Sequence, residues 1–306
     1  MIYTLTANPA IDMNITLDSL KRQEVNRSKK VSYSANGKGI NVSRTLEYFN
    51  IKSTVFGFFG GFSGEYINSE LKKCGICTDP VWVNGITRIN LFLNQNGSEY
   101  TVVNPGPEVN ESKRGELLNK IADLNSSDIL VISGSLPGGT DDSFYTEILE
   151  QCRKNHVRTV LDTSTKNLRE LVEYSPFLIK PNGEEAEKLL GLSVKSEEDC
   201  LNTLFTLRNM GAENILLTIG KRGAYFSNKN QVYYANTVKV KTQNSACAGD
   251  CALGAFLSVW LNDQNSIEPA LKRAAAAGAN AAESSGTGNF ENVSKYEHEI
   301  TVKRLV

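Results

Sequence analysis

Short apolar runs rich in β-branched residues alternate along the chain with longer stretches whose apolar positions recur every three or four residues. The short runs predict strands, and the longer stretches predict amphipathic helices. The predicted strands are residues 2–6, 53–58, 129–133, 159–162, 177–180 and 214–218. The predicted helices are residues 39–49, 64–74, 112–124, 143–155, 183–190, 197–209, 249–261 and 267–283. Because such an alternation builds a mostly parallel sheet covered by helices on both faces, we expect an α/β fold.

Three intervals hold strand-like runs with no helix between them. Residues 223–227 and 231–235 flank Asn228-Lys-Asn230 and predict an antiparallel hairpin at one edge of the main sheet. Residues 13–34 hold two such runs, and residues 87–103 predict a hairpin turning at Asn94-Gln-Asn-Gly97. The last two intervals together predict a separate small sheet that would cover a site as a lid.

These intervals divide the chain into two expected parts. The α/β core is formed by residues 1–11, 35–86 and 106–306, and the β lid by residues 12–34 and 87–105. An exposed apolar face on the lid would favour a homodimer through it.

Composition narrows the function classes. The 306 residues carry a formal net charge of −1 and are 40% hydrophobic, so a full core is expected without a field that would attract nucleic acid or a membrane surface. The N-terminal residues show no basic leader before an apolar stretch, which favours a cytoplasmic location. Six cysteines at irregular spacings do not form a disulfide framework.

The most informative segment is Asn244-Ser-Ala-Cys-Ala-Gly-Asp250, where a carboxylate stands beside very small residues at the start of a predicted helix. A helix start without bulk leaves backbone N–H groups free to face an anion. Asp250 could take a proton from an attacking hydroxyl while the amides of Cys247, Ala248 and Gly249 hold a transferred phosphoryl group. The alternative is that Asp250 only caps the helix, and the motif taken alone favours that alternative.

Two segments near the first strand carry groups suited to a ligand. In Asn36-Gly-Lys-Gly-Ile-Asn-Val-Ser43, Gly37 allows close backbone approach, Lys38 brings positive charge, and Asn41 offers a donor and an acceptor. Asp12, in Asn8-Pro-Ala-Ile-Asp12, follows the strand at the end where open α/β sheets bind ligands, and its carboxylate suits sugar hydroxyls. A plain loop-to-helix turn and a turn-forming aspartate remain as alternatives.

Two later strand ends carry groups suited to a nucleotide. Pro181-Asn-Gly-Glu-Glu185 offers Asn182 and Glu185 to hydrated Mg²⁺, although an acidic first helical turn explains the same residues. Thr218-Ile-Gly-Lys-Arg-Gly223 combines glycines with two cations suited to phosphates, although a glycine-rich turn would look alike.

Taken in order along the chain, these motifs resemble the PfkB/ribokinase-like sugar kinases, and within them the branch of 1-phosphofructokinase and tagatose-6-phosphate kinase. The resemblance covers essentially the whole chain. It rests on Asn-Pro-Ala-x-Asp, Gly-Lys-Gly-Ile-Asn-Val, Gly-Gly-Phe-x-Gly, Thr-Arg-x-Asn, Pro-Gly-Pro, Ser-Gly-Ser-Leu-Pro, Lys-Pro-Asn-x-x-Glu and Ala-Gly-Asp. It implies an ATP-dependent, Mg²⁺-requiring kinase with a Rossmann-like core, a β lid and frequent homodimerisation through that lid.

The resemblance also implies roles for single residues. Asp250 matches the catalytic base, and Ala248 and Gly249, next to Cys247, match the backbone of the anion hole. The residues that match substrate contacts are Asp12, Gly37, Lys38 and Asn41, with Arg88 and Arg27 as lid cations. The residues that match the nucleotide and magnesium motifs are Lys180, Asn182, Glu185, Thr218, Gly220 and Gly223.

The chain departs from the family pattern at three positions in or beside these motifs. Cys247 replaces the first glycine of Gly-Ala-Gly-Asp, Cys251 replaces the serine that commonly follows, and Asn36 replaces a glycine. A positive φ at Cys247 would cost about 1–3 kcal/mol. Asn36 is expected to tolerate a left-handed backbone. Because thiolates at a helix N-terminus can be acidified, sensitivity of Cys247 and Cys251 to oxidants is a further hypothesis.

The predicted function is phosphoryl transfer from MgATP to a primary hydroxyl of a ketohexose monophosphate, with D-fructose 1-phosphate as the leading substrate. Lys38 and Arg88 would anchor the phosphate already on the sugar. A kinase for tagatose 6-phosphate or fructose 6-phosphate is the nearest alternative. The alternative from another functional class is a regulatory protein that binds a sugar phosphate and has lost catalytic turnover. Cys247 is the residue that favours this alternative.

Overall fold

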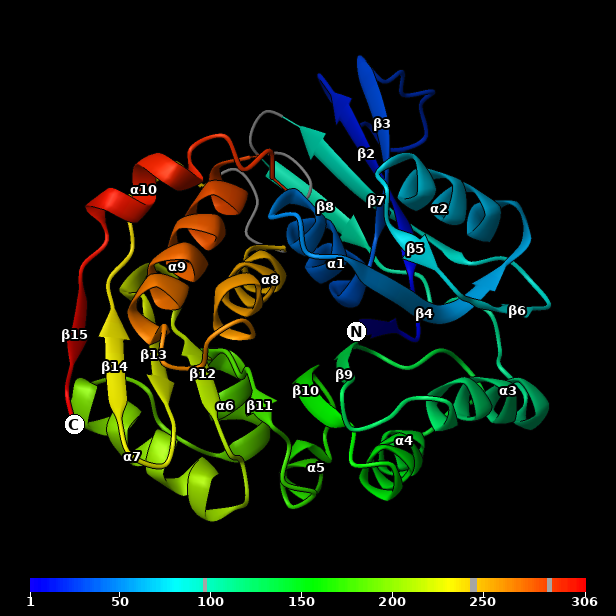
Figure 1. Ribbon diagram of the computed structural model, residues 1–306. Coiled ribbons are helices and arrows are strands. Elements are labelled where there is room, and N and C mark those ends of the chain that lie inside the picture. Colours follow the sequence, from blue (N-terminus) through cyan, green and yellow to red (C-terminus); the bar gives the residue numbers. More distant parts are fainter. Residues whose placement is uncertain (96–97, 243–246, 285–287) are drawn as a thin grey trace.

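The computed structural model, which describes residues 1–95, 98–242, 247–284 and 288–306, consists of a large sheet flanked by helices and a separate small sheet (Figure 1). The large sheet has the strand order β15-β14-β13-β12-β11-β10-β9-β1-β4-β5, and β6 also pairs with β4. The strands from β12 to β5 run parallel, whereas β13, β14 and β15 are antiparallel to their neighbours. Its strands are β1 (Ile2–Thr6), β4 (Ser53–Gly60), β5 (Cys77–Thr78), β6 (Val81–Val83), β9 (Ile129–Gly134), β10 (Arg158–Thr163), β11 (Leu178–Ile179), β12 (Ile215–Thr218), β13 (Ala224–Ser227), β14 (Val232–Ala235) and β15 (Val302–Arg304).

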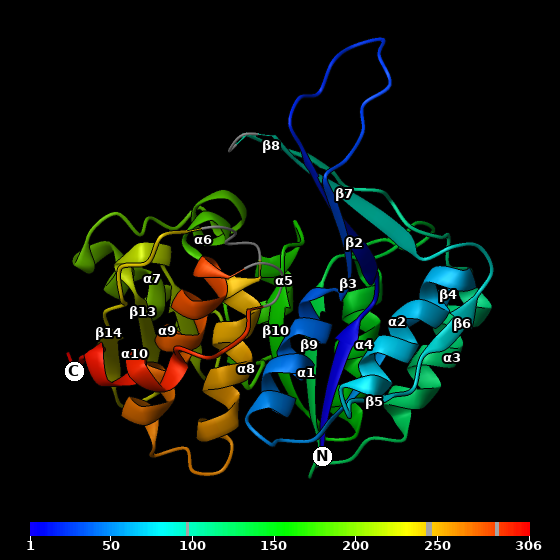
Figure 2. The ribbon, with the colours of Figure 1, turned by 90° about the horizontal axis from the view of Figure 1, so that it is seen from above.

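Helices cover both faces of this sheet (Figures 1 and 2). One face carries α1 (Lys38–Tyr48), α2 (Gly61–Lys73), α8 (Ala248–Trp260), α9 (Ile267–Glu283) and α10 (Val293–Glu299). The other face carries α3 (Glu111–Ala122), α4 (Ser143–Lys154), α5 (Leu168–Val172), α6 (Gly183–Leu190) and α7 (Glu197–Asn209). A short 3₁₀ turn, Gly220–Arg222, follows β12.

The central strands are apolar along their whole length because both of their faces are buried. In β9, Leu130 and Ile132 pack into the core under α3–α7, while Ile129 and Val131 pack into the core under α1, α8 and α9. Burying each such side chain contributes about 1.5–3 kcal/mol. The α/β fold predicted from the alternating pattern is therefore confirmed.

Every predicted strand and helix is present, with ends that differ by at most three residues. The sequence pattern missed α5, α10, β5, β6 and β15. The predicted hairpin forms as β13 and β14, but its predicted place at the sheet edge is wrong, because β15 pairs with β14 and lies outside it. Two of the three β15 side chains, Lys303 and Arg304, are charged, which suits an exposed edge strand and hides it from an apolar pattern.

The small sheet, the lid, stands above the core and has the order β3-β2-β7-β8 (Figure 2). Its strands are β2 (Ala10–Leu17), β3 (Lys30–Asn36), β7 (Arg88–Gln95) and β8 (Ser98–Val102). Residues 96 and 97, the end of the turn expected at residues 94–97, lie outside the described residues.

The two faces of the lid differ in chemistry, as the strand register shows. One face carries two cross-strand rows of apolar side chains, and the opposite face carries Asp12, Asn14 and Asn90. The rows are Tyr33, Met13, Leu91, Val102 and Val31, Ile15, Leu93, Tyr100. Closer to the core, Ile11, Ala35 and Ile89 of the same face pack against α2, so only the outer part is left uncovered.

Candidate active site

Asp250 lies in the first turn of α8, on the wall of a cavity of about 670 Å³. Its side chain is buried, with the residue only 4% exposed. Cys247, the N-cap residue of α8, makes no side-chain capping bond, so its side chain does not occupy the backbone N–H groups of the first turn. Residues 244–246, the start of the Asn244–Asp250 motif, lie outside the described residues.

The surroundings of Asp250 suit a general base. Burial raises the pKa of Asp250 to about 7, the carboxylate of Asp162 adds to the rise, and Lys38, Asn41 and Lys180 oppose it. The side chain of Asn41 fixes the carboxylate by donating from Nδ2 to Asp250 Oδ2 at 2.8 Å. A base with a pKa near neutral pH combines a large ionised fraction with a strong pull on a proton.

This pKa gives a testable pH dependence. Because only ionised Asp250 can accept a proton, kcat/KM, which reports groups of the free enzyme, should fall as the pH decreases through about 7. A pH profile of kcat/KM, measured at sugar-phosphate concentrations below KM, would show this acid limb. A profile that stays flat down to about pH 5 would contradict the assignment of Asp250 as the base.

Asp162, at the end of β10, is a site residue that the sequence analysis missed. It is 1% exposed, and its Oδ1 lies 3.1 Å from Lys180 Nζ and 3.2 Å from Lys38 Nζ. Burial alone would raise the pKa of Asp162, but the ammonium groups of Lys180 and Lys38 hold it below its usual value. The signal was available, because Asp162 ends a parallel strand as the other candidate residues do.

Lys38 and Glu185 complete this charged cluster. Lys38 Nζ lies 3.4 Å from Glu185 Oε1, and Ser164 Oγ donates to the same oxygen. Burial opposes the charge on Lys38, but Asp162, Glu185 and Asp250 together raise its pKa above the usual value. The ammonium therefore stays charged on the cavity wall, beside Lys180.

A second set of polar groups lies at the base of the lid. Asp12 Oδ1 accepts from Asn90 Nδ2 at 2.9 Å, and Asp12 Oδ2 accepts from Asn36 Nδ2 at 2.6 Å. Burial raises the pKa of Asp12, and Asn90, Arg88 and Asn36 oppose the rise. Asn36 Oδ1 in turn accepts from Asn41 Nδ2 at 2.9 Å, so Asp12 is linked through Asn36 and Asn41 to Asp250.

The cavity is lined by both polar and apolar residues, the two kinds of contact that a nucleotide needs. The polar lining residues are Lys38, Lys180, Asn182, Thr218, Lys221, Thr237, Lys239, Thr242 and Asp250, and the glycines include Gly220, Gly223 and Gly249. The apolar lining residues include Leu216, Val238, Val240, Ala252, Ala274, Ala275, Ala279 and Ala282. The structure thus brings the predicted base and the predicted nucleotide residues to one cavity.

A family model described as pfkB family carbohydrate kinase matches residues 6–293. D-tagatose-1-phosphate kinase of Klebsiella oxytoca is 42% identical over 305 residues, and 1-phosphofructokinase of Bacillus subtilis (strain 168) is 34% identical over 305 residues; each match spans 100% of both chains. The solved tetrameric inhibited form of phosphofructokinase-2 from Escherichia coli superposes with a TM-score of 0.89, at 26% identity, over 97% of this chain and 98% of that one.

The chain belongs to the pfkB family of carbohydrate kinases. Carbohydrate kinases of this family use ATP as a substrate. The resemblance inferred from the motifs is therefore confirmed, and so is the class of enzyme, a phosphotransferase that acts on sugars.

In this pfkB kinase the two lid arginines lie in different surroundings. Arg88, the first residue of β7, donates to the backbone oxygens of Asn8 at 2.9 Å and Asn104 at 3.3 Å. Its Nε is buried without a protein partner. Arg27 is exposed in the connection between β2 and β3, which extends away from the core in Figure 2, and it lies outside the polar cluster around Asp12 and Asp250.

Asn182 and Glu185 have a structural task in addition to any ligand role. They form a capping box at the start of α6: Asn182 Oδ1 accepts from the Glu185 backbone N–H, and Glu185 Oε2 accepts from the Asn182 backbone N–H. The second oxygen of Glu185 still faces Lys38 and the cavity cluster. Asn182 and Glu185 can therefore stabilise the first turn of α6 and also contact a nucleotide.

Two glycines of the predicted motifs are required by the backbone. Gly37, the N-cap of α1, has φ +146°, and a Cβ there would lie 2.4 Å from Thr6 Cγ2. Gly223 has φ +94°, and a Cβ there would lie 2.1 Å from the Ala235 carbonyl oxygen. Each therefore shapes a ligand-side loop that no other residue could form.

The departures from the family pattern cause no backbone strain. Cys247 has φ −97°, and Asn36 does not have a positive φ, so the expected cost at Cys247 and the left-handed explanation for Asn36 are both wrong. The thiol of Cys247 lies toward the amides of Asn41 and Asn36, at 3.4 and 3.7 Å. Burial raises the pKa of Cys247 to about 12 and that of Cys251 well above its usual value. This overturns the hypothesis that the two thiols are acidified.

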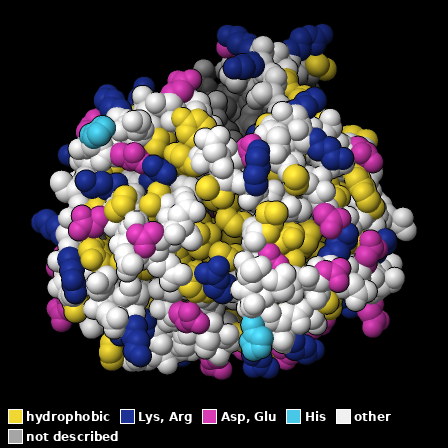
Figure 3. Space-filling model, in the orientation of Figure 1, with side chains coloured by type: hydrophobic (Ala, Val, Ile, Leu, Met, Phe, Trp, Pro, Cys, Tyr) yellow, Lys and Arg dark blue, Asp and Glu magenta, His cyan; other side chains and the backbone are white. Residues whose placement is uncertain are grey.

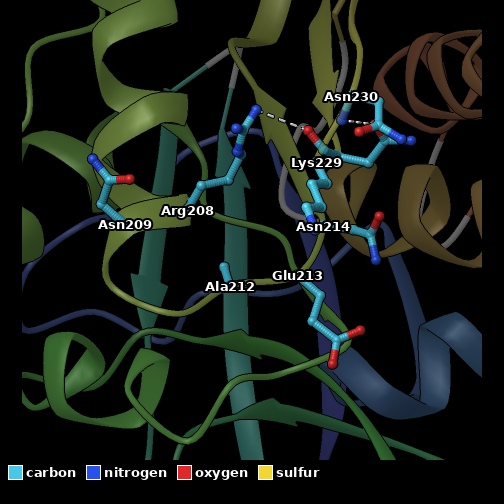
Figure 4. Close-up of a pocket in the computed structure, with 8 residues that line it drawn as sticks. Arg208, Asn209, Ala212, Glu213, Asn214, Lys229 and Asn230 are labelled. Carbon is cyan, nitrogen blue, oxygen red and sulfur yellow. Dashed lines mark hydrogen bonds between the residues drawn. The ribbon is translucent and has the colours of Figure 1, made fainter.

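A second cavity, of about 520 Å³, lies beyond the C-terminal end of α7, beside the β13–β14 turn (Figure 4). Arg208 donates there to the backbone oxygen of Asn228 at 2.8 Å, and Asn214 donates to that of Phe177 at 2.7 Å. These two side chains hold neighbouring backbone, and none of the predicted site residues lines this cavity.

Proposed function

We propose that this protein transfers a phosphoryl group from MgATP to the primary C6 hydroxyl of a ketohexose 1-phosphate. The observation that carries the proposal is the buried carboxylate of Asp250, with a pKa of about 7, at the start of α8 on the cavity wall. The two relatives described above are named for D-tagatose 1-phosphate and fructose phosphate substrates, and two epimers that differ at C4 would share one phosphate position.

In this proposal each polar cluster has one task. Asp250 takes the proton of the attacking hydroxyl, while the first-turn amides of α8 and the ammonium groups of Lys38 and Lys180 stabilise charge on the transferred group. The nucleotide would lie in the cavity, with its base against the apolar lining residues and its phosphates toward Thr218, Gly220 and Gly223, which also line it. We therefore assign Lys38 to the transferred phosphoryl group and not, as predicted from the sequence, to the phosphate already on the sugar, because its ammonium lies among Asp162, Ser164 and Glu185.

The residues present fit a magnesium ion. Asp162 Oδ2 is buried without a hydrogen-bond partner, and Glu185 Oε1 lies in the same charged cluster. Such hard carboxylate oxygens, completed by water and phosphate, are what Mg²⁺ prefers. Asp162 and Glu185 would hold the ion, which would neutralise the phosphates of the nucleotide when bound.

A substrate panel tests the proposal. ADP release would be measured with ATP and Mg²⁺ on D-tagatose 1-phosphate, D-fructose 1-phosphate, D-tagatose 6-phosphate and D-fructose 6-phosphate. We expect the two 1-phosphates to give the highest kcat/KM. Preference for a 6-phosphate would support the alternative substrate class. Saturable sugar-phosphate binding with no ADP release would show that the protein is a binding regulator and that the kinase proposal is wrong.

Arg88 is proposed to hold the phosphate on the sugar. Its free Nε and partly buried guanidinium can make a charge-assisted, bidentate contact that a lysine cannot reproduce. We expect Arg88→Ala to raise the KM for the sugar phosphate at least about tenfold and to leave the KM for ATP unchanged. Arg88→Lys should recover part of the loss, and equal changes in both KM values would contradict the assignment. Arg27 would contribute only if a second copy brought it near a site.

We also propose that the protein is a homodimer through the lid. The uncovered apolar rows of the lid include Tyr33, Tyr100 and Val102, which are 54%, 51% and 46% exposed.

We propose further that the protein is cytoplasmic. On the face of the core seen in Figure 3, acidic and basic side chains are interspersed and gather into no patch of one sign. Within the described residues, no helix is long and apolar enough to cross a membrane. Cell fractionation would test the location.

A charge on the apolar face of the lid should separate the two copies, because it would be buried without a partner. We expect light scattering to give twice the chain mass for the wild type and the single-chain mass for Tyr33→Asp. Phe205→Asp is the matched control, since Phe205 on α7 is 61% exposed away from the lid. A wild-type protein of single-chain mass would contradict the proposed dimer.

A further inference from the structure

The side chain of Asn36 uses its full hydrogen-bonding capacity. Its Oδ1 accepts from the Gly37 backbone N–H at 2.6 Å and from Asn41 Nδ2 at 2.9 Å. Its Nδ2 donates to Asp12 Oδ2 at 2.6 Å and lies 3.7 Å from Cys247 Sγ. An amide has two donor and two acceptor positions, and all four are occupied here. Since Asn36 has no positive φ, its side chain, and not its backbone, accounts for an asparagine at this position.

The groups that Asn36 joins belong to different parts of the molecule. Asp12 lies on lid strand β2, whereas Asn41 lies on core helix α1 and contacts Asp250 on α8. Asn36 is the last residue of β3, one residue before Gly37, which caps α1. It therefore stands where the chain passes from the lid into the core.

Asn36 also fixes the plane of the Asp12 carboxylate. One oxygen of Asp12 is held by Asn90 and the other by Asn36, at 2.9 and 2.6 Å. With a donor on each oxygen, the carboxylate cannot turn about its terminal bond. Without Asn36 only the Asn90 contact would remain, and Asn41 would lose one of the acceptors that orient its amide.

We propose that Asn36 is a positioning residue that locks Asp12 and Asn41 into one hydrogen-bond chain, from the sugar-facing carboxylate of the lid to the carboxylate on α8, and thereby sets acceptor binding. The inference rests on the proposed function for the role of Asp12 toward sugar hydroxyls. The contacts of Asn36 themselves do not depend on that function.

The first test compares Asn36→Ala with the wild type. We expect kcat/KM for the ketohexose 1-phosphate to fall at least about tenfold, because a misplaced contact group costs up to about 10² in rate. The KM for ATP should not change. Ser32→Ala, on the same strand, is the matched control. Sugar-phosphate parameters within twofold of the wild type would overturn the proposal.

The second test uses Asn36→Asp, which keeps an acceptor for Gly37 and Asn41 but faces Asp12 with a second carboxyl group. Such a pair shares one proton at low pH and repels at higher pH. The other groups that face Asp12 are Arg88 on β7 and the thiol of Cys247 before α8. The measured quantity is the ratio of the KM for the sugar phosphate in this variant to that in the wild type. We expect this ratio to rise at least about tenfold between about pH 6 and 8. A pH-independent ratio would overturn the proposal.

A third measurement does not require turnover. The pKa of Asp12, followed by carboxyl ¹³C NMR and assigned with Asp12→Asn, should rise in Asn36→Ala because a donor to the ionised form is lost. A wild-type protein inactive on all sugar phosphates would refute the proposed function, and this titration would still decide the role of Asn36. An unchanged Asp12 pKa would overturn that role.

Discussion

Replacement of Asp250 with asparagine should give a folded protein whose kcat is lower by about 10²–10⁴. Asparagine keeps the shape of the side chain and a partner for Asn41, but it cannot take up a proton. The KM values for ATP and for the sugar phosphate should change little, because the carboxylate acts on the reacting hydroxyl. Turnover equal to that of the wild type would refute the role of Asp250 as the base.

The same substitution should stabilise the fold at alkaline pH. The pKa of Asp250 is about 7 in the folded protein and about 4 in an unfolded chain, so its ionisation opposes folding progressively as the pH rises between these values. The asparagine side chain in Asp250→Asn cannot ionise, and the destabilisation should disappear. We expect Asp250→Asn to raise the melting temperature above that of the wild type by more at pH 8 than at pH 5. Such a result would show that ionisation of the buried carboxylate destabilises the fold. The same difference in melting temperature at both pH values would contradict the raised pKa of Asp250.

Removal of Asp162 should have the largest effect on stability. Asp162→Ala leaves Lys180, which is 3% exposed, with a buried charge and without its ion-pair partner. Loss of one member of a buried ion pair costs about 3–5 kcal/mol, so the unfolding free energy at neutral pH should fall by that amount. Denaturant unfolding would measure it.

Two variants separate charge from packing at this site. Adding Lys180→Met to Asp162→Ala should restore most of the stability, because no unpaired charge remains, but not the activity. Glu184→Ala, which breaks the exposed Lys188–Glu184 pair, is the control and should cost nothing measurable. A double variant as unstable as Asp162→Ala would contradict an electrostatic origin.

The fold could be predicted because both faces of the central strands are buried and their sequences are continuously apolar. The elements that were not predicted are short ones, which are stabilised by the elements they pair or pack with. The charged strand β15 is held by pairing with β14, and α10 packs with Val293 and Tyr296 against the core under α9. Neither has a periodic pattern long enough to be recognised.

For the site, the sequence identified residues more easily than their partners. Asp250 and Asn41 were both expected at the site, but their direct contact depends on the packing of α8 against α1. At Gly254 of α8 a Cβ would lie 2.9 Å from the Val42 carbonyl oxygen of α1. The two helices can therefore pack this closely only because residue 254 is a glycine. The place of Asp162 at the end of a predicted strand could be seen in the sequence, but its contacts with Lys180 and Lys38 depend on the sheet order, which the sequence does not show.

Ala10 of β2 stands opposite Asn36 and Arg88 in the register of the lid, and these three residues lie where the lid strands leave or rejoin the core. If the small sheet closes as a lid, these residues would lie on its hinge axis. In such a movement residues near the axis would travel least and the far tip would travel most. The acceptor would then meet Arg88 and Asp12 before closure as well as after it, and the swing of the tip would serve mainly to shut water out.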